Sequence, residues 1–340
     1  MALEFMTGFD CYTDSAGMLE EWDSLSYYTP SAGRFAPGAA VYGNTFQKFL
    51  PSGALATRTV GFAFQIPLTV QIPGPLVSFY DNAGSASQVE LSYNFATHQL
   101  TVTRNGTALG TCAGLYLPGV WYYLEVQVTI SSTAGAVTVN AYPAPTPGGS
   151  NAVFAATNLN TQTSANAAFD TLILARSWPV YFDDLYVTNP SGGANVGFLG
   201  ESRITTILPT GDSAVNHAFT PSTGTAHFSC VSQSDPTTDV PSVSANAVGA
   251  IDTYTFPVPG INGTVAGVKV SLCARKDDTG ARSIASEFRT NAGVEHSGTE
   301  QSLYSNYKFF GTNWDLNPAT SAAWVAADFA GAEFGMKVTG

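Results

Sequence analysis

Apolar and polar residues alternate with a period of two along most of the chain. From Leu124 to Ser131, leucine, valine and isoleucine alternate with glutamate, glutamine, threonine and serine. Residues two apart share one face of a strand, so this segment predicts a strand with one buried face and one wet face. After the turn Ser132–Gly135, a second alternation at 137–141 predicts the partner strand of a hairpin. The pair Asn105-Gly106 predicts another hairpin, because both residues accept positive φ.

The same pattern predicts strands throughout the rest of the sequence. The further predicted strands are 59–66, 76–80, 89–93, 171–175, 181–188, 203–208, 253–256, 268–274, 282–288 and 333–338. Helical periodicity is nearly absent before residue 190, and Ala322–Ala330 is predicted to form two helical turns. Many short strands joined by turns predict an all-β chain of two β-sandwich domains in tandem, with very little helix.

Loop-forming residues mark one domain boundary and two exposed connections. The stretch Asn189–Asn195 is rich in glycine and separates two sets of strands, so it predicts domains at 1–190 and 196–340. The segments Ala144–Ser150 and Ser229–Val243 are rich in small polar residues and proline. They are predicted to be exposed loops.

Charge excludes several classes of protein. The 340 residues carry 13 Lys and Arg against 25 Asp and Glu, a net charge of −12, and only 11% of the chain is charged. Such a chain repels nucleic-acid phosphates. It has no run of about 18 apolar residues that would span a bilayer, and its first residues do not resemble a secretory signal peptide. The large neutral surface that sparse charge implies favours a symmetric homo-oligomer, because interface centres are depleted in charged residues.

Cysteines and histidines give no pattern of a metal or catalytic site. Neither a C-x-x-C spacing nor a G-x-S-x-G motif is present, so no zinc site and no hydrolytic triad are expected. The cysteines are predicted to be free thiols, which agrees with synthesis in a cytoplasm. The residues concerned are Cys11, Cys112, Cys230, Cys273, His98, His217, His227 and His296.

Acidic residues are the remaining candidates for acid/base chemistry. Glu21 and Asp23 are in phase on an extended chain, but their segment is predicted to be a solvated acidic turn. Asp183 and Asp184 are adjacent on a predicted strand and are expected to point to opposite faces, so they would not form one acid/base pair. A buried member would either lock neighbouring turns by accepting backbone N–H bonds or bind calcium with loop oxygens, and the lock is favoured. The segment 276–280 lacks the spacing of a calcium loop, and no phosphate-binding glycine loop follows any strand. We therefore predict no catalytic residue, no metal and no cofactor.

Aromatic residues are plentiful and suit either a packed core, an interface or a sugar-binding surface. Trp121-Tyr122-Tyr123 begins a strand, so its side chains are expected to divide between core and surface. The pair Tyr27-Tyr28, together with Tyr304 and Tyr307, lies in loop-like sequence and is expected to be more exposed. The sequence alone assigns no ligand-binding residue.

Several short segments also occur in an order that is similar to a known family. In the first part these are Thr7–Asp10, Trp22, Gly33–Phe35, Val60–Ala63, Leu76–Phe79, Trp121–Glu125 and Tyr181–Tyr186. In the second part they are Gly197–Ile204, Leu208–Asp212, Ala274–Gly280, Asn317–Thr320, Trp324 and Glu333–Lys337. The order resembles the concanavalin A-like, laminin G-like jelly-roll domains of tailed-bacteriophage proteins, and the later segments resemble the parts that follow in such proteins.

This resemblance implies jelly-roll-like sandwiches in a structural accessory protein of the phage particle. It implies a tail- or neck-associated fibre or adhesin subunit, made in the host cytoplasm and located in the virion. A capsid decoration protein is the alternative within the same class, and a lectin-like module that binds host surface glycans is the alternative from another class. The expected partners are other virion proteins, further copies of the chain and, for an adhesin, a host glycan. An enzyme is not expected, and the sugar- and calcium-binding residues of lectins have no clear counterparts here.

Overall fold

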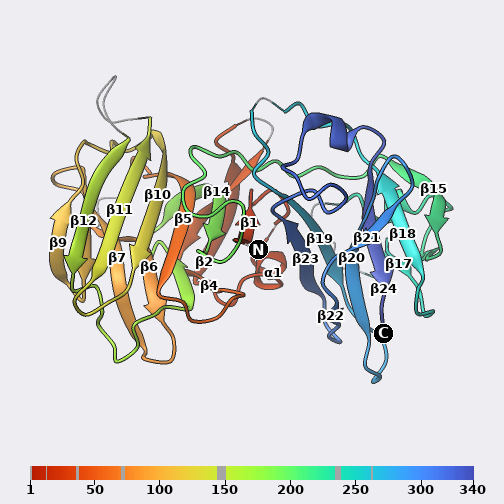
Figure 1. The fold of residues 1–340 in the computed structure, drawn as a ribbon, viewed down its shortest axis with the longest axis horizontal. Helices are drawn as coiled ribbons and strands as arrows, with labels where there is room; N and C mark the ends of the chain where they lie inside the picture. Colours follow the sequence, from red (N-terminus) through yellow and green to blue (C-terminus); the bar gives the residue numbers. More distant parts are fainter. Residues whose placement is uncertain are drawn as a thin grey trace. The chain divides into compact units, whose positions relative to one another are not determined.

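The computed structural model describes residues 2–12, 14–35, 38–69, 73–143, 151–233, 239–261 and 263–340. The chain divides into two compact units, Met1–Thr205 (unit 1) and Thr206–Gly340 (unit 2). Antiparallel strands dominate both, coloured red to green in unit 1 and green to blue in unit 2 (Figure 1). The prediction of an all-β chain with very little helix is confirmed. Among the described residues, no helix is long and apolar enough to cross a membrane.

Unit 1 is a sandwich of two sheets with a short helix, α1 (Ser15–Leu19). Sheet A has the strand order β12-β11-β10-β5-β14-β3-β2, with β1 pairing β14, and sheet B has the order β4-β13-β6-β7-β8-β9. The strands of sheet A are β1 (Leu3–Thr7), β2 (Tyr27–Ala32), β3 (Ala39–Asn44), β5 (Thr57–Gln65), β10 (Trp121–Thr129), β11 (Gly135–Tyr142), β12 (Ala152–Leu159) and β14 (Val180–Thr188). Those of sheet B are β4 (Phe46–Phe49), β6 (Gly74–Asp81), β7 (Ala86–Asn94), β8 (Gln99–Arg104), β9 (Thr107–Thr111) and β13 (Thr171–Leu174).

The core of unit 1 lies between these sheets. Phe182 of sheet A contacts Phe46 of sheet B with ring centroids 6.3 Å apart, and Phe62 lies 5.8 Å from Phe182. All three side chains are completely buried. Buried and half-buried residues alternate along β11, as the period of two predicts, whereas the middle of β5 is buried on both faces.

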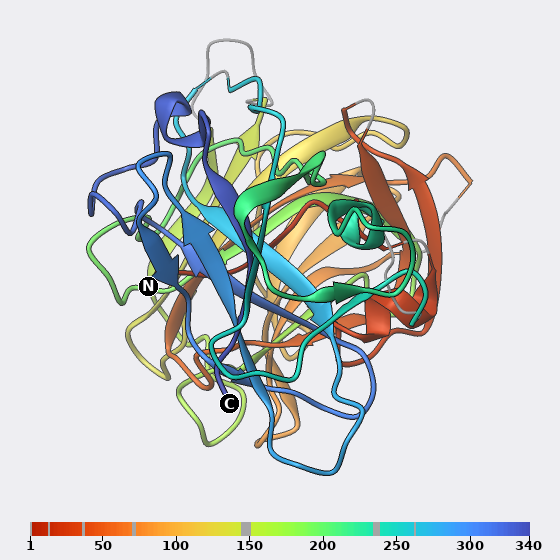
Figure 2. The same cartoon turned by 90° about the vertical axis from the view of Figure 1, so that its right-hand side faces the viewer.

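Unit 2 is built around sheet D, with the strand order β15-β18-β24-β20-β21 and β22 pairing β20. A two-stranded sheet, β19-β23, covers one face of it, and β16 pairs with β17 in a second small sheet. The elements are β15 (Gly211–His217), β16 (Thr220–Pro221), α2 (Phe228–Val231), β17 (Val243–Ser244), β18 (Ile251–Thr255), β19 (Val268–Ala274), β20 (Ser283–Arg289), β21 (Glu295–Ser297), β22 (Gln301–Ser302), β23 (Lys308–Trp314), the 3-10 helix η1 (Ala326–Phe329) and β24 (Glu333–Val338). Figure 2 gives a second view of these strands.

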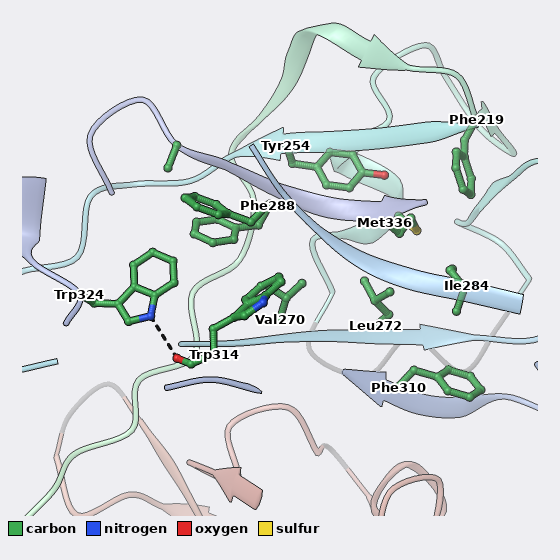
Figure 3. Packing of buried hydrophobic residues seen from close by; sticks show 12 residues of the cluster. Phe219, Tyr254, Val270, Leu272, Ile284, Phe288, Phe310, Trp314, Trp324 and Met336 are labelled. Carbon is green, nitrogen blue, oxygen red and sulfur yellow. Dashed lines mark hydrogen bonds between the residues drawn. The ribbon is translucent and has the colours of Figure 1, made fainter. Parts of the chain in front are cut away.

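The core of unit 2 lies between sheet D and the β19-β23 layer (Figure 3). Phe288 of β20 is at its centre, 5.2 Å from Phe334 and 5.3 Å from Trp324 between ring centroids. Trp324 Nε1 donates a hydrogen bond of 3.1 Å to the carbonyl oxygen of Trp314, so the indole donor is satisfied inside the core.

Most predicted strands are present, and the Asn105-Gly106 turn has the expected positive φ values of 46° and 77°. The predicted strand 203–208 is wrong: Ile204 gives its backbone N–H to the Asp184 carboxylate, so it has no strand partner there. The prediction of two helical turns at Ala322–Ala330 is also wrong, since η1 is a single short turn.

The two predicted loops are described only in part. Ala144–Ser150 lies outside the described residues, as does 234–238 within the segment Ser229–Val243. The remainder of that second segment includes most of α2 and the start of β17.

The division between the units falls after Thr205, beyond the predicted boundary at Asn189–Asn195. Residues Gly197–Ile204, here named the junction segment, are bound to sheet A by their backbone. The N–H groups of Leu199, Gly200 and Ile204 donate to side chains of β14 and β10 at 3.1, 2.7 and 2.7 Å. These bonds make the junction segment part of unit 1.

Candidate functional site

The outer face of sheet A, directed away from sheet B, carries accessible aromatic side chains with a defined register. On β10, Leu124 and Val126 belong to the core, so Trp121, Tyr123 and Glu125 lie on the opposite, outer face. The division of the Trp121-Tyr122-Tyr123 triplet between core and surface does not follow the two faces, because Tyr123 is completely buried on the outer face while Trp121 and Tyr122 are half-buried.

Strand pairing brings four side chains of this face into one line. Tyr42 is opposite Tyr181, Tyr181 is opposite Gln65, and Gln65 is opposite Trp121. The line therefore crosses β3, β14, β5 and β10 in that order. Tyr27 of β2 extends it, because its ring lies against Tyr42 with centroids 6.0 Å apart. We name these five residues the aromatic row.

The rings of the aromatic row differ in orientation. Tyr42 and Tyr181 stack with centroids 4.5 Å apart and planes at 30°, whereas Trp121 lies 6.4 Å from Tyr181 with planes at 59°. Gln65 stands between Tyr181 and Trp121, since it is paired with both. Trp121 and Tyr181 thus form a tilted pair of rings in contact, next to the Gln65 amide.

Polar groups in the row are available for hydrogen bonding. Gln65 Nε2 donates to the carbonyl oxygen of Gly119 at 3.0 Å, which fixes the amide. Its Oε1 accepts no hydrogen bond from any described residue. Burial and the neighbouring phenols of Tyr181 and Tyr27 raise the pKa of Tyr42, so its hydroxyl remains protonated. Tyr27 is 48% exposed and the other members are half-buried.

Next to the row, the junction segment covers the part of the outer face around Glu125. Glu125, which is completely buried, accepts hydrogen bonds from the Tyr142 and Tyr186 hydroxyls and from the N–H of Gly200. Leu199 of the junction segment packs on the same cluster. This part of the face is therefore closed, whereas the residues of the aromatic row remain accessible.

The acidic pair of β14 forms the lock that the sequence favours. Asp183 accepts the N–H of Arg34 at 2.7 Å and that of Asp184 at 2.8 Å, and Asp184 accepts the N–H of Ile204 at 2.7 Å. The Arg34 guanidinium lies 3.7 Å from Asp184. The expectation of opposite faces is wrong, because Asp184 has φ = 52° at a register shift and both carboxylates converge on Arg34.

Burial raises the pKa of both carboxyl groups. The pKa of Asp183 rises to about 7, through burial and then the neighbouring Asp184 charge. The pKa of Asp184 rises to about 6, mainly through burial. Within the described residues no group of three or more His, Cys, Asp and Glu side chains is arranged to hold a metal ion.

The other candidates named from the sequence have local partners. Glu21 accepts the Tyr12 hydroxyl, and Asp23 accepts the N–H of Phe49 at 2.6 Å. All four cysteines are described, and none forms a disulfide. The remaining contacts are Tyr28 Oη to the Tyr12 carbonyl (2.6 Å), Tyr307 Oη to Asp239 (2.7 Å), Tyr304 stacked on Phe310 (6.3 Å), His98 to Tyr93 (2.7 Å), His227 to Asp252 (2.9 Å), His217 against the His227 ring (6.3 Å) and His296 against Phe288 (5.8 Å).

Sequence reasoning found two members of the aromatic row and missed three. Trp121 and Tyr27 were marked as aromatic candidates by composition, whereas Tyr42, Gln65 and Tyr181 were not singled out. A period of two shows that Tyr181 and Asp183 share a face, but it does not show which strand lies beside β14. The signal for the row is strand register, which a single sequence does not contain.

No model of a protein family matches the chain, and no curated protein matches it. Among solved structures, it is similar to the catalytic domain of a glycoside hydrolase family 131 protein from Coprinopsis cinerea, with 11% identity, 59% of this chain and 99% of that chain covered, and a TM-score of 0.32. Peanut lectin gives 8% identity, coverage of 54% and 97%, and a TM-score of 0.30.

Trypanosoma rangeli sialidase in complex with the inhibitor DANA gives 14% identity, with 47% of this chain covered and a TM-score of 0.30. The chain covers only 27% of that sialidase. Similarities this low carry no argument about activity or ligand.

Proposed function

We propose that unit 1 binds carbohydrate on the aromatic row. The observation that carries the proposal is the open line of Tyr42, Tyr181, Gln65 and Trp121 across four strands of sheet A. The apolar C–H faces of sugars pack on flat rings, and their hydroxyls need nearby donors and acceptors. The row offers both, because the Trp121–Tyr181 ring pair lies beside the Gln65 amide, whose oxygen accepts no bond from the described chain.

The expected affinity is modest. A well-placed aromatic contact contributes about 0.5–1.5 kcal/mol beyond the area that it buries. A few such contacts on an open surface support a dissociation constant on the order of 0.1–1 mM for one site. Several copies on one assembly would strengthen binding through multivalency.

The test is isothermal titration of the whole protein with a panel of neutral oligosaccharides. Trp121→Ala removes one ring of the Trp121–Tyr181 pair and is expected to weaken binding at least tenfold. Tyr304→Ala is the matched control, because Tyr304 is an aromatic residue of unit 2 that is 58% exposed and outside the row. Equal binding by the wild type and Trp121→Ala, or no saccharide binding at all, would refute the proposal.

We further propose that the site binds glycans without cleaving them. Hydrolysis of a glycosidic bond needs two available carboxyl groups about 5–9.5 Å apart. Asp183 and Glu125 lie on the same strands as the row, and protein donors occupy both. Reducing ends released from a polysaccharide should stay at background. Release that disappears in Glu21→Gln at unchanged stability would contradict this.

The finer role that we propose is that of a tail- or neck-associated adhesin of a phage particle. Its support is the sequence resemblance, from Thr7–Asp10 to Glu333–Lys337. Mass spectrometry of purified particles tests it through copy number. A few to tens of copies per particle are expected, hundreds would indicate capsid decoration, and absence from particles would refute a virion role.

A further inference from the structure

The aromatic row is longer than one sugar ring. From β2 to β10 it crosses four strand spacings, which is roughly 19 Å at about 4.8 Å per spacing. Aromatic rings stand at both ends, Tyr27 on β2 and Trp121 on β10. A ligand that uses the whole row therefore has several sugar residues and lies across the strands.

The row contains two separate places where a sugar face can pack. One is the accessible surface of the Trp121–Tyr181 ring pair. The other is at Tyr27, whose ring is perpendicular to Tyr42 at 89° and is the most exposed of the row. Between them, Tyr42 and Tyr181 stack on each other, so their facing surfaces are already in contact. Thr29 donates a hydrogen bond of 3.0 Å to the Tyr27 hydroxyl and so holds this outer ring.

Charge on this face disfavours acidic sugars. The row consists of three tyrosines, a tryptophan and a glutamine, so it contains no Lys, Arg, Asp or Glu, and Arg34 of the same unit is paired with Asp184 and Glu201. Residues 1–205 contain thirteen Asp and Glu against six Lys and Arg. A uronic or sialic acid would find no cation to pair with in the row and would be repelled by the unit as a whole.

We propose that the ligand of the aromatic row is a neutral oligosaccharide of at least three sugar residues, with one residue packed on the accessible surface of the Trp121–Tyr181 pair and another on Tyr27. This rests on the proposed function and specifies its ligand class. The chain crosses the strands, and Tyr42 and Tyr181 provide hydroxyl groups along its middle part.

The experiment measures binding against ligand length. The whole protein is titrated with β-1,4-, β-1,3- and α-1,4-linked hexose oligomers of one to six residues and with oligogalacturonates of matched length. For any neutral oligomer series that binds, affinity should increase with length up to three or four residues and then stay constant. Tyr27→Ala should lower the affinity for oligomers of three or more residues by roughly threefold to tenfold and leave the affinity for one- and two-residue ligands unchanged. Tyr27→Phe should retain the higher affinity for long oligomers. Trp121→Ala should weaken the binding of oligomers of every length.

The possible results distinguish failure of this inference from failure of the proposed carbohydrate binding. Trp121-dependent binding that does not increase beyond one or two residues would refute the extended ligand and leave carbohydrate binding intact. Oligogalacturonates that bind as tightly as neutral oligomers would refute the neutral class. Absence of binding by every saccharide would overturn both proposals. Circular dichroism of each variant confirms that the exposed-residue substitutions have not unfolded the chain.

Discussion

The core of unit 1 lies between two broad sheets, whereas the core of unit 2 lies beneath a layer of only two strands. The difference is visible in the exposure of comparable side chains. Phe62, Leu124 and Phe182 of unit 1 are 0% exposed, while Phe310, Trp314 and Met336 of unit 2 are 8–9% exposed. Figure 3 shows Phe310 and Trp314 on the β19-β23 layer.

This comparison explains why the outer face of sheet A is available for function. Because sheet B closes the core of unit 1 completely, the outer side chains of β5, β10 and β14 are not needed to cover it. In unit 2 the thin layer leaves the core less protected, so more of each strand's apolar surface is committed to stability. We expect the free energy of unfolding to respond most strongly to substitutions in the core of unit 1. Ligand binding should respond to substitutions on its outer face.

The largest expected effect is a core truncation in unit 1. Phe62→Ala should lower the free energy of unfolding by about 5 kcal/mol, since its cavity is enclosed on every side. Phe310→Ala, the matched change in unit 2, should cost about 3 kcal/mol, because the thin layer can move into the space. Hydrogen exchange read separately for residues 1–205 and 206–340 measures each value. A larger loss in unit 2 would reverse the comparison.

The next effect concerns where unit 1 ends. A fragment of residues 1–205 keeps the bonds from Gly200 to Glu125 and from Ile204 to Asp184, whereas a fragment of residues 1–190 loses both. Hydrogen bonds to charged groups contribute about 1.5–3 kcal/mol each, so the longer fragment should be about 3 kcal/mol more stable. Urea unfolding of the two fragments tests this. Equal midpoints would show that the junction segment is not part of the folded unit.

The sequence predicts the strands of this protein better than it predicts the site. Alternation along Leu124–Ser131 and the Asn105-Gly106 turn are local signals, so the strands that they mark are present. The aromatic row depends on β14 lying between β5 and β3, and Tyr181 is more than a hundred residues from Gln65. The strand expected at 203–208 failed for a related reason: Ile204 bonds to Asp184, a residue distant in sequence that local pattern does not reveal.

A smaller effect is expected from pH, and it too is confined to unit 1. The pKa values of Asp183 and Asp184, raised to about 7 and about 6, exceed the ordinary value for aspartate. Between about pH 4 and 7 the folded state therefore binds more protons than the unfolded state, so stability falls as the pH rises through this range. Unit 1 should be more stable at pH 5 than at pH 8. Asp183→Asn should flatten this dependence, and a wild-type maximum at pH 8 would contradict the prediction.

The smallest effect on stability is expected from the aromatic row itself, and adjacent residues on β14 provide the sharpest contrast. Tyr181 is on the outer face and half-buried, whereas Phe182 is completely buried between the sheets. Tyr181→Ala leaves no enclosed cavity and should cost about 1 kcal/mol, while Phe182→Ala should cost about 3–5 kcal/mol. Saccharide binding should respond in the opposite sense: Tyr181→Ala loses affinity, and Phe182→Ala retains it wherever the unit remains folded. Thermal unfolding and titration of both variants test the pair together. If Tyr181→Ala destabilised unit 1 as much as Phe182→Ala did, the row would be a structural element of the sandwich and not a binding surface.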